Sequence, residues 1–186
     1  LLPLHVFEPR YRAMLETVLH TGGTFGVLLC RTFDPATLEG EPFEVGTTVE
    51  IEEFDRMDDG SYSVLALGHR RFRLESVLRD GETPYLRGRV RWLEDEDGLQ
   101  ADDPLAEQAK LMFYAAVRLS RKILKKPFEE PGFPKDAAKL SFYIAQNLVG
   151  SLVLKQELLA GTGTRARLER ERDILAAAVK PLAAQA

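Results

Sequence analysis

The sequence predicts an α+β fold, in which an antiparallel β unit over residues 1–100 is followed by a helical unit over residues 101–186. The main observation is a change in hydrophobic periodicity near residue 100, from the alternation typical of strands to the spacing typical of amphipathic helices. Net charge changes sign at the same place: residues 1–100 carry 11 basic and 19 acidic side chains, whereas residues 101–186 carry 14 and 10. We therefore expect two structural units with different surfaces.

The first 23 residues predict a short extended segment followed by a capped helix. Pro9 suits the first turn of a helix, because its missing N–H would have no intrahelical acceptor there. Apolar side chains then recur at helical spacing over residues 11–19, and Gly22-Gly23 ends the helix. We expect Arg10 and Tyr11 to tie this helix to the sheet through hydrogen bonds.

Five segments before residue 100 alternate apolar and polar residues and are bounded by turn-forming residues, which is typical of strands. They are residues 24–31, 47–54, 61–67, 70–78 and 85–93. Asp59-Gly60, between the second and third of these segments, indicates a hairpin. In the last segment Arg87, Arg89 and Arg91 share one face and apolar side chains share the other. We therefore expect an antiparallel sheet with one solvated face.

Four helices are expected after residue 102. Asp103-Pro104 supplies an N-cap and a first-turn proline for a helix that runs to about residue 124. Three prolines within eight residues then make Pro127–Pro134 a loop, because too many backbone donors are missing for a helix. Apolar spacing and intervening glycines place the remaining helices at residues 136–149, 151–160 and 164–179.

Composition indicates a soluble globular chain. Apolar residues make up 45% of the 186 residues, yet no apolar run approaches the roughly 20 residues that cross a bilayer, and the first residues lack the features of a secretion signal. We therefore expect a cytoplasmic protein with no membrane partner. The single cysteine, Cys30, lies in an apolar run, where a free cysteine usually packs as a small apolar side chain.

Motifs for catalysis, metal binding and cofactor binding fail when their spacing is checked. Residues 22–26 are rich in glycine but lack the lysine of a phosphate-binding loop, and the three histidines lack zinc-binding spacing. The acidic turns around Gly60 and Gly98 lack the ligand order of a calcium loop, and no serine-nucleophile motif is present. We expect no metal, no cofactor and no catalytic activity. A hydrolase that uses cleft residues such as His69 and Glu53 is the second alternative.

An arginine face is the sharpest electrostatic feature of the predicted sheet. It comprises Arg71 and Arg73 on one predicted strand and Arg87, Arg89 and Arg91 on another, with Tyr85 beside them. Arginine and aromatic side chains together are typical of single-stranded nucleic-acid binding. However, Glu50 and Glu52 are placed to pair with these arginines, and residues 1–100 have a net charge of −8. A nucleic-acid partner is therefore disfavoured, and an RNA-binding module is the first alternative function.

Eight short motifs follow one another along almost the whole chain. In the first half they are LHVFEPRYRAM at residues 4–14, FGV at 25–27, VGT at 45–47, LGHRRF at 67–72 and YL at 85–86. In the second half they are LSFYIA at residues 140–145, KQELL at 155–159 and RL at 167–168. This ordered series resembles the N-terminal, substrate-binding domain of the Lon protease family.

The resemblance implies a PUA-like β subdomain with an inserted helix, then a helical subdomain, and a role in engaging substrates and in assembly. It implies a non-catalytic, stand-alone module, because the ATPase and protease modules of a complete Lon have no counterpart in this sequence. The implied partners are unfolded or exposed apolar polypeptide segments, a separate ATPase or protease, and, through weak self-association, a second copy of the chain. Relatives usually carry an apolar strand before the segment that matches residues 1–14, so a strand of the family pattern is expected to be missing here.

Two aromatic side chains are the candidate substrate contacts. Phe128 and Phe133 lie in the proline-rich loop Pro127–Pro134, which can present aromatic rings at a low ordering cost. The alternative is that both rings fill the junction between the two subdomains.

Overall fold

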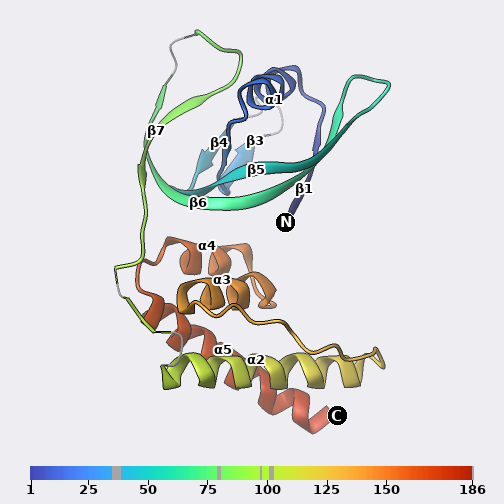
Figure 1. Cartoon of the computed structure of the whole chain (residues 1–186), viewed down its shortest axis with the longest axis vertical. Helices are drawn as coiled ribbons and strands as arrows, with labels where there is room; N and C mark the ends of the chain where they lie inside the picture. The colour runs from blue at the N-terminus through green and yellow to red at the C-terminus, as the bar shows by residue number, and fades with distance from the viewer. Residues whose placement is uncertain (35–38, 79–80, 97, 101–102, 186) are drawn as a thin grey trace. The chain divides into compact units, whose positions relative to one another are not determined.

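The chain forms two compact units, Leu1–Leu93 and Glu94–Ala186 (Figure 1). The computed structural model describes residues 1–34, 39–78, 81–96, 98–100 and 103–185. The first unit, here the sheet unit, holds the strands and one helix, and the second, the helical unit, holds four helices. The predicted α+β class is confirmed, and the described strands form an open sheet rather than a closed barrel. The division lies before Glu94 rather than at residue 100.

The main sheet is antiparallel, with strand order β1-β6-β5-β2 and with β7 also paired to β6. Its strands are β1 (Leu2–Val6), β2 (Phe25–Val27), β5 (Val45–Arg56), β6 (Tyr62–Leu78) and β7 (Arg87–Trp92). A separate two-stranded sheet pairs β3 (Cys30–Asp34) with β4 (Glu39–Pro42). The strand predicted at residues 24–31 is therefore divided between two sheets.

The long strand β6 joins two segments that the sequence predicts as separate strands, residues 61–67 and 70–78. The intervening Gly68-His69 does not break it, because β5 pairs along both halves and absorbs the curvature at two irregularities in register. The predicted hairpin is confirmed at the turn between β5 and β6. Gly60 there has φ +78°, a left-handed conformation that glycine adopts without strain.

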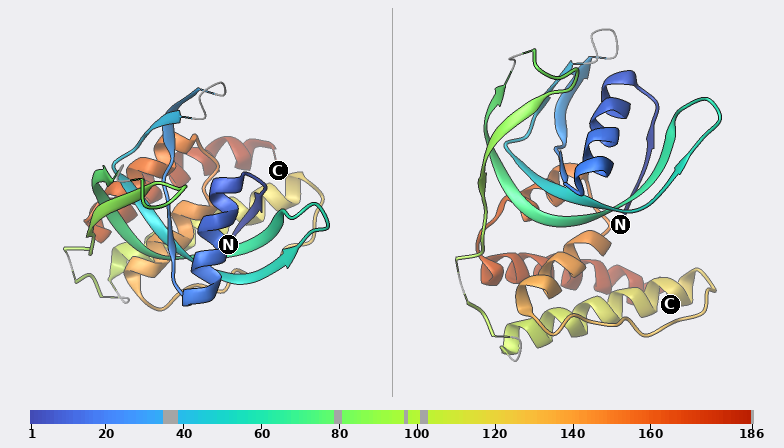
Figure 2. Two further views of the ribbon diagram at one scale, coloured as in Figure 1. Left: turned by 90° about the horizontal axis from the view of Figure 1, so that it is seen from above. Right: turned by 45° about the horizontal axis from the view of Figure 1, so that its top comes forward.

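Helix α1 (Pro9–Thr21) lies within the curve of the sheet (Figure 2). It buries Leu15 and Val18, and Gly22 ends it at φ +64°. The core of the sheet unit joins Leu15 to buried side chains of three strands, namely Val6, Val49, Tyr62, Val64 and Ala66. The helix therefore covers the apolar face of the sheet, as its apolar stripe predicts.

Arg12 and Tyr62 provide two hydrogen bonds that tie α1 to the hairpin. Arg12 Nη1 donates to the carbonyl of Gly60 at 3.2 Å, and Tyr62 Oη donates to Glu16 Oε1 at 3.3 Å. Arg10 pairs with Glu8 at 2.9 Å and stacks on the Tyr11 ring. The role of Arg12 was not expected from the sequence, because helical periodicity does not show where the distant hairpin tip lies.

The helical unit contains α2 (Pro104–Ile123), α3 (Ala137–Asn147), α4 (Leu152–Ala160) and α5 (Thr164–Gln185). Side-chain caps begin three of them: Asp103 accepts from the Leu105 N–H, Asp136 from the Lys139 N–H and Ser151 from the Leu154 N–H. The Leu105 hydrogen bond, helped by the Arg165 guanidinium, lowers the pKa of Asp103. The last helix continues beyond the predicted residue 179 and through Pro181.

Helices α2 and α5 pack along each other and enclose the core of the helical unit with α3 (Figure 1). The buried side chains of this core include Ala109 and Phe113 of α2, Leu140 and Ile144 of α3, and Leu168 and Leu175 of α5. The apolar spacing of α2 predicts which of its faces is buried.

Candidate functional site

Three apolar side chains lie in solvent where α3 ends and α4 begins. Val149 is 99% exposed, Leu152 is 65% exposed and Val153 is 53% exposed. We call these three residues the apolar tip. Burying a side chain of this size against a partner contributes roughly 1.5–3 kcal/mol, so the tip is a favourable place for apolar contact.

Local hydrogen bonds hold the backbone around the apolar tip. Leu148 ends α3 and is buried, and its N–H bonds to the carbonyl of Ile144. Ser151 Oγ accepts from the Leu154 N–H at 3.1 Å, and Lys155 Nζ donates to the carbonyl of Gln146 at 2.9 Å. The tip is therefore displayed by an ordered turn, which lowers the entropy lost on binding.

The two loop aromatics pack against helices of their own unit. Phe133 meets the rings of Phe113 and Tyr143 edge to face, each at a centroid distance of 5.9 Å. Phe128 meets the Tyr114 ring edge to face at 5.1 Å. Both phenylalanines are half-buried. These contacts show that the two rings fix the proline-rich loop to α2 and α3, whereas the side chains of the apolar tip lie in solvent.

Carboxylates lie beside most of the arginine face. Arg73 pairs with Glu44 at 2.5 Å, Arg87 with Glu82 at 2.6 Å and Arg91 with Glu75 at 3.7 Å. Arg71 is largely buried in the sheet. Strand pairing sets Arg73 directly opposite Arg91, so β6 and β7 do bring these arginines together. Their positive charge is nevertheless locally balanced.

A cation also stacks on the exposed ring of Trp92, which lies on the face of β7 opposite to Arg91 because successive side chains of a strand alternate. Trp92 is 44% exposed, and the Arg70 guanidinium stacks on it at 4.5 Å from the ring centroid. Arg89 is exposed and has no hydrogen bond or ion pair within the described part of the chain. Arg70 was not among the residues chosen from the sequence.

A serine, a histidine and an aspartate meet at the hairpin tip, but their order is not that of a hydrolase. Ser61 Oγ lies 3.0 Å from His5 Nε2 and donates to Asp59 Oδ1 at 2.6 Å. A nucleophilic serine instead gives its proton to a histidine that an acid orients. Ser61 is also 3% exposed, and its hydrogen bonds lower the pKa of Asp59. This cluster therefore fastens β1 to the hairpin. His69, from the hydrolase alternative, pairs with Glu50 instead.

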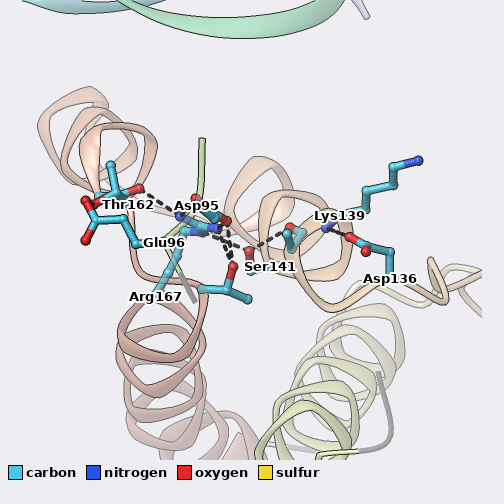
Figure 3. Close-up of polar contacts among 10 residues, drawn as sticks. Asp95, Glu96, Asp136, Lys139, Ser141, Thr162 and Arg167 are labelled. Atoms are coloured by element: carbon cyan, nitrogen blue, oxygen red, sulfur yellow. Dashed lines mark hydrogen bonds and ion pairs between the residues drawn. The ribbon is translucent and has the colours of Figure 1, made fainter. Parts of the chain in front are cut away.

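Arg167 is the centre of a buried polar network in the helical unit (Figure 3). Its side chain is 1% exposed, and Nη2 pairs with Asp95 Oδ2 at 2.5 Å. Nε donates to Ser141 Oγ at 2.8 Å, and Nη1 donates to the carbonyl of Gly161 at 2.9 Å. The Phe142 ring lies 3.9 Å from the guanidinium carbon. The network thus joins α5 to α3 and to the segment that precedes α2.

A second set of contacts holds the same segment against the loop before α5. Glu96 N donates to the carbonyl of Thr162 at 2.8 Å, and Thr162 Oγ1 donates to Glu96 Oε1 at 3.0 Å. Thr164 Oγ1 donates to Asp95 Oδ2 at 2.6 Å. These bonds assign residues 94–96 to the helical unit. Since every group here has a partner inside the protein, the network is structural rather than a site for a ligand.

In the ranges that the structure describes, no three His, Cys, Asp or Glu side chains gather in a way that could hold a metal ion. Among the described helices, none combines the length and hydropathy required to cross a bilayer.

Sequence reasoning missed the apolar tip and the Arg167 network. Val149, Leu152 and Val153 lie in the helices predicted at residues 136–149 and 151–160, where apolar residues usually face a core. The turn signal Gly150-Ser151 between them was available, and it marks the place where a helix end can present apolar side chains. Arg167 and Asp95 are 72 residues apart, and nothing in the local pattern of either predicts the other.

Comparison with known proteins gives one family. Residues 1–177 match the family model described as the ATP-dependent protease La (LON) substrate-binding domain. Among curated proteins, Lon protease 2 of Syntrophobacter fumaroxidans is 27% identical over 175 residues, which are 90% of this chain and 21% of that protein. Lon protease of Amoebophilus asiaticus is 26% identical over 169 residues, 85% of this chain and 19% of that protein. The chain thus spans about a fifth of the length of these relatives.

Two solved structures have the same fold. A Lon N-terminal domain protein from Xanthomonas campestris superposes with a TM-score of 0.64 at 29% identity, covering 91% of this chain and 86% of that one. The N-terminal domain of Lon protease from the Mycobacterium avium complex superposes with a TM-score of 0.65 at 15% identity, covering 94% of this chain and 90% of that one. At 15% identity the second likeness concerns the fold alone.

Proposed function

Because the chain belongs to the family of ATP-dependent protease La (LON) substrate-binding domains, we propose that these 186 residues form a non-catalytic module that binds exposed apolar segments of other polypeptides. The observation that carries the proposal is the apolar tip, whose three side chains lie in solvent on an ordered turn. A fixed apolar projection suits an unfolded chain, because an unfolded chain exposes apolar side chains that a folded protein buries.

The proposal assigns no chemistry to the module. The Ser61 cluster has the wrong order for nucleophilic catalysis, and the buried polar network around Arg167 is satisfied internally. A bound polypeptide would therefore be held and passed on rather than cut. A separate ATPase or protease is the partner that this role calls for.

Phe128 and Phe133 enter the proposal as supporting residues. Their rings fix the loop Pro127–Pro134 to α2 and α3, and both are half-buried. Part of each ring therefore stays accessible for apolar contact. We expect them to contribute less to binding than the tip, where more apolar surface is free.

Binding of an unfolded protein tests the proposal. A reduced, carboxymethylated protein that stays unfolded serves as the probe, and its affinity is measured with the parent chain and with Leu152→Ser. We expect Leu152→Ser to weaken binding by about tenfold, as the loss of about 1.4 kcal/mol of apolar contact requires. Leu111→Ser is the matched control, because Leu111 is 63% exposed on α2, close to the 65% of Leu152. Absence of binding by the parent chain, or equal loss in both variants, contradicts the proposal.

The loop aromatics are tested with the same probe. Phe128→Ala and Phe133→Ala are compared with Leu152→Ser, after circular dichroism has shown that each variant is folded. We expect a smaller loss of affinity for both. A larger loss than for Leu152→Ser would move the binding site from the tip to the loop.

RNA binding is the second candidate, favoured by the stack of Arg70 on the exposed Trp92. Stacking and positive charge together are typical of surfaces that hold single strands. Retention of a single-stranded RNA on filters across a salt series distinguishes this function. Phosphate contacts strengthen as salt is lowered, so failure to retain RNA at low salt eliminates it.

A further inference from the structure

Glu171 is a buried acid without a hydrogen-bond partner. It lies on α5 and is 0% exposed, and neither carboxyl oxygen has a hydrogen-bond partner among the residues that the structure describes. It stands three residues after Leu168 and four before Leu175, both buried in the core of the helical unit. An apolar side chain would fit the helical pattern at this position. A buried polar group left without a partner lowers stability by about 1–3 kcal/mol, so the carboxyl needs an explanation.

Arg167, one helical turn earlier, cannot supply the missing partner. A guanidinium has five N–H donors. Those of Arg167 are directed to Ser141, Gly161, Asp95 and Thr164, with Asp95 receiving two of them. The Arg167 charge therefore acts on Glu171 through space, without a hydrogen bond.

Other charged groups on the neighbouring helices are engaged elsewhere or solvated. The titratable side chains of α2 are Glu107, Lys110, Tyr114, Arg118, Arg121 and Lys122. Those of α3 are Lys139 and Tyr143, and those of α4 are Lys155 and Glu157. Lys110 pairs with Glu107, Lys155 with the Gln146 carbonyl, and Glu157 with Arg170. Among the charges of the described residues, that of Arg167 is the one that lowers the pKa of Glu171.

The environment keeps Glu171 in its neutral form. Burial raises its pKa to about 9, and the nearby Arg167 charge offsets only part of this effect. At neutral pH the folded helical unit therefore holds a proton on Glu171. The same carboxyl exposed to water would lose that proton, because its ordinary pKa is 4.5.

We infer that Glu171 weakens the packing of α5 against the core of the helical unit, and that each opening of this packing releases one proton. The bound proton is the link between pH and the opening, since it is held in the closed state and lost in the open state. Opening also exposes apolar side chains that are otherwise buried, among them Phe113 of α2 and Leu168 of α5. The helical unit thus carries a proton-linked hinge at the second turn of α5.

Hydrogen exchange measures this opening directly. Between pH 5.5 and 8.5 the release of one proton raises the opening constant about tenfold per pH unit. Amides of α5 around residues 168–175 and the facing amides of α2 should lose protection by that factor, after correction for the intrinsic pH dependence of exchange. Amides of the sheet unit serve as an internal reference, and they should not share the slope.

Two variants separate the hinge from a general effect of pH. Glu171→Gln keeps the shape of the side chain and cannot ionise, so its α5 amides should lose the slope. Glu169→Gln is the matched control, because Glu169 is exposed on the same helix, and it should keep the slope. An unchanged slope in Glu171→Gln overturns the inference.

A measurement on the parent chain guards against a variant that does not fold. The carboxyl carbon of Glu171 can be followed by NMR as pH is raised, and its midpoint should lie near pH 9, far above the ordinary value of 4.5. A midpoint near the ordinary value overturns the inference, whatever the variants do.

Discussion

The sheet unit and the helical unit differ in whether their charged side chains pair at the surface or in the interior. In the sheet unit arginines and carboxylates pair at the surface, as Arg73 does with Glu44. In the helical unit Arg167 is buried and its donors are hydrogen-bonded, whereas Glu171 is buried without a hydrogen-bond partner among the described residues. The apolar tip of the same unit lies in solvent. Departures from satisfied packing in a folded protein tend to mark functional places. Exposed apolar side chains such as Phe7 also occur in the sheet unit, so the contrast that distinguishes the helical unit is between its buried Arg167 and its buried Glu171.

The largest expected effect is the loss of the buried cation. Arg167→Ala leaves Asp95 largely buried without its charged partner, so the free energy of unfolding of the helical unit should fall by about 3–5 kcal/mol. Urea denaturation followed by circular dichroism at the helical signal measures this change.

Its counterpart in the sheet unit is Arg73→Ala. The Arg73–Glu44 pair is solvated, with Glu44 68% exposed, so its loss should cost at most about 1 kcal/mol. Equal losses from the two variants would remove the distinction between the two units.

Replacing the unpartnered acid should stabilise the helical unit. Glu171→Leu removes a buried group without a partner, so the free energy of unfolding at pH 7 should rise by about 1–3 kcal/mol. The folded unit keeps the Glu171 proton up to about pH 9, whereas the unfolded chain loses it near pH 4.5, so stability of the parent falls as pH rises between these values. The gain from leucine should therefore be larger at pH 8 than at pH 5. A destabilised Glu171→Leu at both pH values would show that the carboxyl supports the fold.

A smaller effect is expected at the turn that displays the apolar tip. Ser151→Ala removes the side-chain cap of α4, which should lower the free energy of unfolding by about 1 kcal/mol. Because the turn also orders Val149 and Leu152, binding of an unfolded polypeptide should weaken slightly as well. Ser63→Ala on β6 is the control, since Ser63 is exposed and caps no helix. A Ser151→Ala chain with unchanged stability would mean that the cap does not hold the turn.

The sequence predicts the local features of the fold well. Pro9 and Asp103-Pro104 begin helices where expected, and Gly60 turns the β5–β6 hairpin. These features depend on neighbouring residues, whose conformational preferences are visible in the sequence. Strand ends were less predictable, as the continuous β6 shows, because pairing with β5 overrides a local break.

The candidate site is harder to predict, because it depends on contacts between distant segments. Leu152 and Val153 have the spacing of core residues, and only the packing of α4 shows that they lie in solvent. Glu171 sits among charged residues of α5 and so resembles a solvated position. Its place three residues after Leu168 and four before Leu175 was the signal that it faces the core.

The position of a bound polypeptide tests the central claim most directly. Methyl NMR of the parent chain is recorded as the unfolded probe protein is added, with the valine and leucine methyl groups assigned. The account predicts that the methyl groups of Val149, Leu152 and Val153 shift first and most strongly, while those of the sheet unit stay in place. Shifts confined to the sheet unit around Val90 and Trp92, with an unperturbed tip, would contradict it.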